Sequence, residues 1–216
     1  NEPDSIYRKY LRSSNNKVYN HEVRYPAEIV QHRISFVPQG GNWRNVPEDL
    51  WPTDRNNRHS SAYKRLDENK PSCTIDTGNN HSNYFHPLYN RIPTVREAAR
   101  LQSFPDDFVF VGNRSEQYRQ VGNAVPPLLA CKIAEAILSY IDDEPKGNGI
   151  IDLFCGCGGL SKGFELAGFE VKAAIDMWDD AIKTFNHNHK NPVGQCVDIH
   201  NWTEEYLDDL KKSGVV

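Results

Sequence analysis

The last third of the chain changes from strand-like to helix-like apolar spacing. Ile150–Phe154 is a short, mostly apolar run, which is typical of a strand buried on both faces. A glycine-rich loop follows at once, and the next apolar residues recur at helical spacing up to Gly168, where a helix end favours a residue that takes positive φ without strain. The loop glycines are Gly156, Gly158 and Gly159. The pattern therefore predicts a strand, a tight turn and a helix.

Two further strands are expected downstream. The first, Glu170–Asp176, ends in a carboxylate, and the second, Gln195–Ile199, contains Asp198 near its end. In an open α/β sheet, ligands bind where the carboxyl ends of the strands meet. Asp176 lies near the roughly 20-residue offset from the glycine loop at which an acid reaches the hydroxyls of a ribose. With Asp198 placed to accept from an adenine amino group, the three strand ends predict one adenosine pocket.

The glycine spacing narrows the class of ligand. A dinucleotide-binding loop follows G-x-G-x-x-G, but the third glycine counted from Gly156 would fall at Ser161. The spacing here is G-x-G-G, which disfavours a dehydrogenase.

Helical periodicity also marks the middle of the chain. Thr94 and Glu97 form the S/T-x-x-E pattern of a helix N-terminus ahead of an apolar stripe. Gln120–Asn123 is predicted as a turn before a helix that begins at Pro126-Pro127 and continues to Tyr140. The other expected elements are a helix over Asp179–Asn188, a helix after Asn201 and a fourth strand from Gly214.

The first third carries less periodic signal. Residues 1–32 are polar and are expected either to lean on other parts of the protein or to be partly mobile. Alternation over Pro71–Thr77 predicts a strand in a small β lobe over about 33–90. Trp43 follows a Gly-Gly turn and is either a packing anchor, which we favour, or a base-stacking residue. Residues 53–65 mix cations, hydroxyls and amides, which suits DNA phosphates or a solvated loop.

Three long motifs resemble one family. Asp152-Leu-Phe-Cys-Gly-Cys-Gly-Gly159 is similar to the first signature of the DNA (cytosine-5)-methyltransferases, which bind S-adenosylmethionine. Arg96-Glu-Ala-Ala-Arg-Leu-Gln-Ser-Phe-Pro-Asp106 and Gln120-Val-Gly-Asn-Ala-Val-Pro-Pro127 are similar to its last two. The resemblance covers most of the chain from about Arg33 to Ile199. The last motifs precede the first here, as expected of a circularly permuted gene.

The resemblance implies a fold and a set of site residues. The fold is an α/β, Rossmann-like methyltransferase domain with a mostly parallel sheet, present in part, with a small β-containing lobe on the target-recognition side. S-adenosyl-L-methionine is the implied cofactor, with predicted contacts at Phe154, Gly156, Gly158, Gly159, Leu160, Asp176, Met177, Asp198, Ile199, Asn123, Ala124 and Val125. Double-stranded DNA is the implied partner, with predicted contacts at Arg55, Arg58, His59, Lys64 and Arg65.

Composition sets limits on this interpretation. With 216 residues, 38% of them hydrophobic, the chain can bury one sizeable core and a small second lobe. Five cysteines without metal-ligand spacing favour a reduced intracellular protein with no metal site. The resemblance implies a location in the prokaryotic cytoplasm, on the nucleoid. The net charge is −4, but basic residues outnumber acidic ones in residues 1–100. That excess favours polyanion contacts in the first half, although ordinary solvated surface explains it too. No signal peptide or membrane span is expected.

The expected domain organisation follows the order of the motifs. Residues 1–92 are part of a DNA-facing lobe, and residues 93–141 hold the helices of the two last motifs. Residues 142–149 are a charged, turn-rich linker at the permutation point, and residues 150–216 are the cofactor-binding half.

Catalytic chemistry is where the chain departs from the family. Methylation at cytosine C5 requires a thiolate that adds to C6, and the family carries this cysteine in a Pro-Cys motif that is absent here. The Glu-Asn-Val motif that contacts the flipped base is absent too. Cys73 occurs as Pro-Ser-Cys and is interpreted as structural.

These absences lead to two hypotheses. The first is an inactive part of a restriction–modification methyltransferase, either a fragment or a subunit, that self-associates or binds a second polypeptide carrying the missing motifs. The second is a regulatory paralogue that binds S-adenosylmethionine or DNA without turnover.

Overall fold

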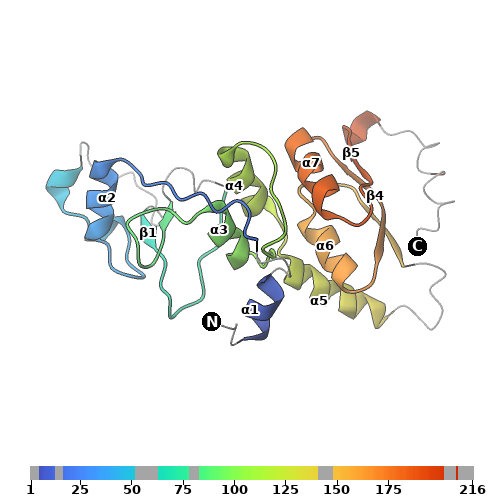
Figure 1. Cartoon of the computed structure of the whole chain (residues 1–216), viewed down its shortest axis with the longest axis horizontal. Helices are drawn as coiled ribbons and strands as arrows, with labels where there is room; N and C mark the ends of the chain where they lie inside the picture. Colours follow the sequence, from blue (N-terminus) through green and yellow to red (C-terminus); the bar gives the residue numbers. More distant parts are fainter. Residues whose placement is uncertain are drawn as a thin grey trace.

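The structure is a computed structural model that describes residues 5–12, 17–51, 63–77, 83–140, 148–201 and 208. The molecule is elongated (Figure 1): α2 and β1 lie at one end, α3 and α4 in the middle, and α5, α6 and α7 with β4 and β5 at the other end. The expected linker at 142–149 lies largely outside the described residues. The same holds for the fourth strand from Gly214 and, apart from Asp208, for the helix expected after Asn201.

A parallel sheet forms the base of the half that contains α6 and α7 (Figure 1). Its strands are β3 (Gly149–Asp152), β4 (Glu170–Asp176) and β5 (Gly194–Cys196), in the order β3-β4-β5. Both neighbouring pairs are parallel. The crossovers are α6 (Gly159–Leu166) and α7 (Asp179–Asn188). This arrangement confirms an α/β fold with a parallel sheet.

The first strand differs from its expected burial. Ile150 and Ile151 are only half-buried, and Phe154, which follows the strand, is 74% exposed. The prediction of a strand buried on both faces was wrong for the described residues, in which β3 is half-buried and is an edge strand that pairs with β4 alone.

The third strand also differs from its expected length. It ends at Cys196, so Asp198 lies beyond it and begins the short helix η5 (Ile199–Asn201), where its carboxylate accepts from the His200 backbone N–H at 3.0 Å. The strand predicted over Gln195–Ile199 was therefore too long. The Asp198 carboxylate bonds to the backbone of His200, and this local hydrogen bond competes with strand pairing.

Two consecutive helices connect the motif segments to the sheet. Gln120–Asn123 forms the last turn of α4 (Arg114–Asn123) and is not the separate turn expected, because the helix begins at the Asn113 cap and continues to its C-cap at Ala124. α5 (Pro127–Leu138) starts at the expected prolines. It crosses α6 closely: a Cβ on Gly163 would lie 2.3 Å from the Ala130 Cβ. Glycine at this point lets the two backbones touch.

The N-terminus of α3 (Val95–Leu101) forms as the sequence predicts. The Thr94 side chain accepts from the Glu97 N–H, and the Glu97 carboxylate accepts from the Thr94 N–H. Glu97 also pairs with Arg91 at 2.7 Å. Burial would raise the pKa of Glu97, but the hydrogen bonds from Arg91 and Thr94 together lower it to about 2. The cap is therefore ionised and paired at neutral pH.

The polar first segment docks on α3, as its composition suggested. It contains two helices that the sequence analysis did not predict, α1 (Ile6–Leu11) and α2 (Glu28–Ser35). Between them, residues 17–21 form a strap, in which Asn20 donates to the Phe110 carbonyl and accepts from the Phe110 N–H, both at 2.9 Å. Asn20 pairs with Phe110 as a neighbouring strand would, which fixes the strap to the loop after α3.

The lobe around α2 contains little sheet. Its strands β1 (Lys64–Arg65) and β2 (Tyr84–Phe85) form one short parallel pair. Pro71–Thr77 is not a strand, so that prediction was wrong: alternation alone does not make a strand when the segment joins no ladder. Trp43, in the short helix η1 (Trp43–Asn45), packs against the core, in agreement with a packing anchor. A second short helix, η2 (Glu48–Leu50), follows it. The main core is one continuous cluster of buried side chains, the first of which in sequence is Ile34 and the last Cys157.

Candidate functional site

A cavity of about 310 Å³ opens where the carboxyl ends of β3 and β4 meet the junction of α4 and α5. Three segments line it: the glycine loop, the end of β4 and the turn at Ala124. The lining residues are Arg119, Gln120, Asn123, Ala124, Val125, Phe154, Cys155, Gly156, Cys157, Gly159, Leu160, Asp176, Met177 and Trp178. Cavities of this size commonly bind small molecules.

The lining contains all the cofactor contacts predicted from the sequence except three. Gly158 lies below the loop surface and is buried. Asp198 and Ile199 lie past β5, and Asp198 is exposed and bonded to His200. The predicted cofactor contacts of these two residues stay predictions, because neither residue lines this cavity.

Asp176 is held in a fixed orientation at the floor of the cavity. One carboxylate oxygen accepts from the Gly156 N–H at 2.9 Å, and the other accepts from the Trp178 N–H at 2.9 Å. These bonds tie the glycine loop to the end of β4. Because each carboxylate oxygen has two lone pairs, both retain an acceptor site for a ligand hydroxyl.

The cavity rim is apolar on one side and cationic on another. Phe154 and Met177 are 74% and 76% exposed, which is unusual for side chains of this size. The Arg119 guanidinium lies 4.5 Å from the centre of the Trp178 ring, within cation–π distance. The site can therefore contact a flat apolar ring at the rim while Asp176 binds hydroxyls below.

Five lining residues were not among the predicted contacts: Arg119, Gln120, Cys155, Cys157 and Trp178. Arg119 and Gln120 lie four and three positions before Asn123, so the helical period would have found them if α4 had been extended through the motif. Trp178 is half-buried and lines the cavity.

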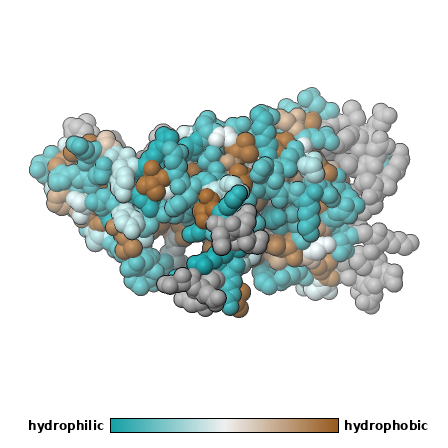
Figure 2. Space-filling view, viewed as in Figure 1, coloured by the Kyte–Doolittle hydropathy of each residue, from teal (hydrophilic) through white to brown (hydrophobic). Residues whose placement is uncertain are grey.

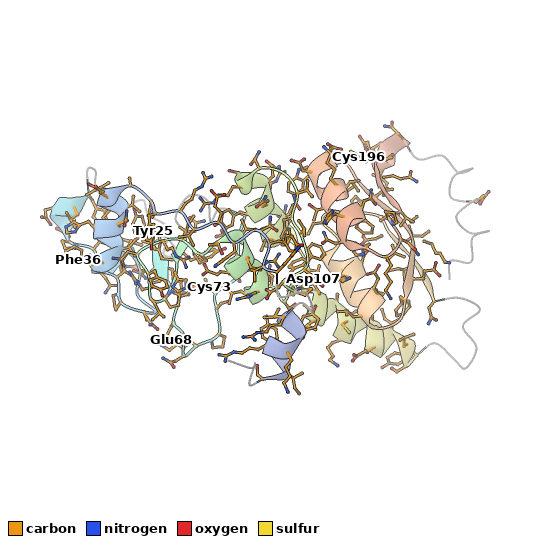
Figure 3. The ribbon with its side chains drawn as sticks, viewed as in Figure 1. Tyr25, Phe36, Glu68, Cys73, Asp107 and Cys196 are labelled. Carbon is orange, nitrogen blue, oxygen red and sulfur yellow. The ribbon has the colours of Figure 1, made fainter. Side chains whose placement is uncertain are left out.

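None of the motif cysteines has the environment of a nucleophile. Cys155 and Cys157 are 5% and 3% exposed, and burial raises the pKa of both thiols, that of Cys157 to about 12. Burial also raises the pKa of Cys73. Since the thiolate is the reactive form, these three cysteines are inert at neutral pH. Figure 3 shows Cys73 and Cys196 in opposite halves of the molecule.

Labelling of the native chain with a disulfide reagent should therefore modify the exposed Cys196 about tenfold or more faster than Cys155 and Cys157. Peptide mapping by mass spectrometry measures the order, and a Cys196→Ser variant should lose the fast phase. Fast modification of Cys155 in the folded chain would contradict the buried, protonated thiol described above.

The predicted DNA contacts divide into three groups. Arg55, Arg58 and His59 lie outside the described residues. Lys64 is half-buried and lines a second cavity of about 500 Å³ in the α2 lobe. Arg65 is 7% exposed, and its guanidinium donates to the Ile34 carbonyl at 2.8 Å and the Pro87 carbonyl at 3.2 Å. These internal contacts hold the Arg65 guanidinium inside the lobe, and its contact with DNA stays a prediction.

Two negative predictions can be compared with the described residues. In that part of the chain, no group of three His, Cys, Asp or Glu side chains could hold a metal ion. One stretch, Arg114–Leu138, has the length and apolar composition of a membrane-crossing helix. The structure divides it into α4 and α5 at the bend before Pro127, so it is weak evidence for a membrane segment.

Comparison with known proteins gives one family. The family model described as C-5 cytosine-specific DNA methylase matches residues 3–139 and 149–214. The chain is 44% identical over 136 residues to Type II methyltransferase M1.HphI of Haemophilus parahaemolyticus, covering 63% of this chain and 35% of that protein. It is 35% identical over 156 residues to Type II methyltransferase M.DdeI of Desulfomicrobium norvegicum, covering 65% and 37%. The chain thus spans about a third of the length of these relatives.

A shorter relative is matched along almost its whole length. Type II methyltransferase M.AquIB of Picosynechococcus sp. is 37% identical over 142 residues, which cover 59% of this chain and 95% of that protein.

Proposed function

The chain belongs to the C-5 cytosine-specific DNA methylase family, and on that premise we propose that it is the cofactor-binding and DNA-facing part of a restriction–modification methyltransferase. Methylases of this family use S-adenosyl-L-methionine as methyl donor. The observation that carries the proposal is the cavity formed jointly by the glycine loop, Asp176 and the α4–α5 junction. Action on double-stranded DNA in the cytoplasm, at the nucleoid, is part of the same proposal.

The residues of the cavity fit an adenosyl cofactor. The oriented Asp176 carboxylate would bind the ribose hydroxyls, and the exposed apolar side chains of Phe154 and Met177 would contact the adenine. The α4–α5 junction, from Asn123 to Val125, would close the other wall. When bound, the cofactor supplies an electrophilic methyl group. The chain's own part is to bind and orient it and to exclude water from its reactive end.

The nucleophile is proposed to come from a segment outside these 216 residues. Cytosine C5 becomes reactive only when a thiolate adds to C6. No cysteine of the chain follows a proline, and the described thiols nearest the cavity are buried and protonated. The chain alone is therefore proposed to be inactive. The Glu-Asn-Val motif would come from the same missing segment.

Two surfaces of the described residues suit such a segment. The free edge of β3 offers backbone donors and acceptors for another parallel strand. On α5, Leu129, Ile133 and Ile137 form an exposed stripe at helical spacing, 55%, 43% and 39% exposed. Figure 2 shows a mostly hydrophilic face with brown patches in the region of α5. The full-length match to M.AquIB, a chain shorter than this one, agrees with a methyltransferase assembled from parts.

The test combines binding and reconstitution. Calorimetry on the 216-residue chain should detect S-adenosylhomocysteine, and a methylation assay on the same sample should give no transfer to DNA cytosine. Addition of a polypeptide with the Pro-Cys and Glu-Asn-Val motifs should restore transfer. Methylation by the chain alone would overturn the proposed division of labour.

The second candidate function is a regulatory paralogue. The intact cavity and the buried thiols are compatible with cofactor binding without turnover. Ultracentrifugation separates the two candidates: a monomer that unfolds cooperatively and binds no complementary polypeptide would favour the regulatory function.

A further inference from the structure

A buried histidine lies directly beneath the glycine loop. His189 follows the end of α7, where its backbone N–H donates to the Phe185 carbonyl at 3.1 Å. Its ring is stacked on the Phe185 ring, with centroids 3.9 Å apart and planes at 13°. Phe108, from the loop after α3, meets the ring edge-on at 6.5 Å. The side chain is fully buried and does not line the cofactor cavity.

The two ring nitrogens face two different parts of one helix. Nδ1 lies 3.0 Å from a carboxylate oxygen of Glu165, in the last turn of α6. Burial would raise the pKa of Glu165, but the contacts with His189 and Lys162 lower it below its usual value. The carboxylate is therefore ionised, and the imidazole is one of its two partners.

Nε2 faces the beginning of the same helix. Neither ring nitrogen makes a hydrogen bond of good geometry among the residues described, and a Cβ built on Gly158 would lie 2.1 Å from Nε2. The same Cβ would lie 2.8 Å from the Phe185 ring. Gly158 also has φ +93°, so a side chain here is disfavoured by the backbone as well as by the imidazole. The imidazole ring therefore packs against the glycine loop at Gly158, whose backbone has the left-handed conformation.

This contact connects His189 to the cofactor residues. Gly158 accepts the first helical bond of α6, from the Lys162 N–H at 2.8 Å, and two residues earlier Gly156 donates to Asp176. Because the loop is short and bonded at both ends, a displacement at Gly158 moves its neighbours in the cavity wall.

We propose that His189 is a positioning residue for cofactor binding, which fixes the position of the glycine loop through its contact with Gly158 and its close contact with the Glu165 carboxylate. The inference rests on the proposed function, because it concerns the same cavity. It goes beyond core packing: a phenyl ring would fill the space and stack on Phe185, but it would leave the buried Glu165 with one partner fewer.

A double-mutant cycle tests the contact. The variants are Gly158→Ala, His189→Ala and the double variant, and calorimetry measures S-adenosylhomocysteine affinity. Each single change should weaken binding about tenfold or more, whereas the double variant should be at least about threefold tighter than the product of the two losses, because removing the imidazole makes room for the Cβ. Losses that multiply, or a His189→Ala affinity equal to that of the unchanged chain, would overturn the proposal.

Three further measurements separate positioning from general stability. Added imidazole should restore the affinity of His189→Ala, whereas the control His187→Ala, an exposed position on α7, should bind as the unchanged chain does. Glu165→Gln preserves shape, so it keeps the test available if His189→Ala unfolds, and it should weaken binding several-fold without a loss of cooperative unfolding. Unchanged affinity in Glu165→Gln would also overturn the proposal. If the unchanged chain binds no S-adenosylhomocysteine, the proposed function itself fails and this inference falls with it.

Discussion

Replacing Arg96 with alanine should lower the free energy of unfolding by about 5 kcal/mol, enough to unfold a chain of ordinary stability. The Arg96 side chain is 0% exposed, and its guanidinium donates to the carbonyls of Tyr19 at 2.9 Å, Pro105 at 2.6 Å and Phe108. Burial lowers its pKa to about 10, so it is charged at neutral pH. The substitution removes the side-chain donor to all three carbonyls, of which that of Pro105 still accepts from the Phe108 N–H, and it leaves a void in the core.

Urea unfolding followed by circular dichroism measures the effect. Arg96→Lys retains a charge but not the planar fork, so it should cost less than alanine and still more than 1 kcal/mol, approximately. The matched control is Arg24→Ala, which removes an exposed arginine paired with Glu22 and should change stability by less than about 1 kcal/mol. A stability for Arg96→Ala close to that of Arg24→Ala would show that the strap, α3 and the following loop do not depend on this side chain.

Replacing Asp176 with alanine should weaken S-adenosylhomocysteine binding by roughly 100-fold or more. Two ribose hydroxyls would lose a charged acceptor, at about 1.5–3 kcal/mol for each bond. The Gly156 and Trp178 N–H groups would lose their acceptor too, so the loop would be less ordered before the ligand arrives. Asp176→Asn preserves the shape of the side chain and one acceptor oxygen, so its affinity should lie between those of the unchanged chain and Asp176→Ala.

Calorimetry at one pH and salt concentration gives the comparison. Asp198→Ala is the informative control, because Asp198 lies outside the cavity lining and its carboxylate is bonded to His200. We expect its affinity to be near that of the unchanged chain. If Asp198→Ala is the weaker variant, the adenine role predicted from the sequence holds after all. Equal affinity in Asp176→Ala and the unchanged chain would reject the ribose assignment.

Local patterns were sufficient for much of the fold. Strand β4, helix α7 and the Thr94–Glu97 cap lie where the sequence predicts them, and Gly168 has φ +98° at the end of α6. In each case the determining interactions join residues within a few positions of one another: apolar periodicity, side-chain-to-backbone caps and the freedom of glycine. The residues lining the cavity were largely predictable for the same reason, since strand ends and a glycine loop place them together.

Other features depended on contacts between distant segments. Arg65 and Arg96 donate to backbone carbonyls that lie up to 77 positions away in the sequence. Residue type alone could not predict this, because an arginine can equally well face solvent, bind DNA or be buried. Pro71–Thr77 alternates like a strand but forms no ladder among the described residues, and β3 is half-buried and pairs there with β4 alone. The sequence around His189 does not predict a role for it, and only the structure places its ring against Gly158. The sequence by itself determined the local elements and the cofactor-side edge of the sheet. Only the tertiary structure decided which polar side chains are buried, because burial is a property of the whole packed chain and not of any window along it.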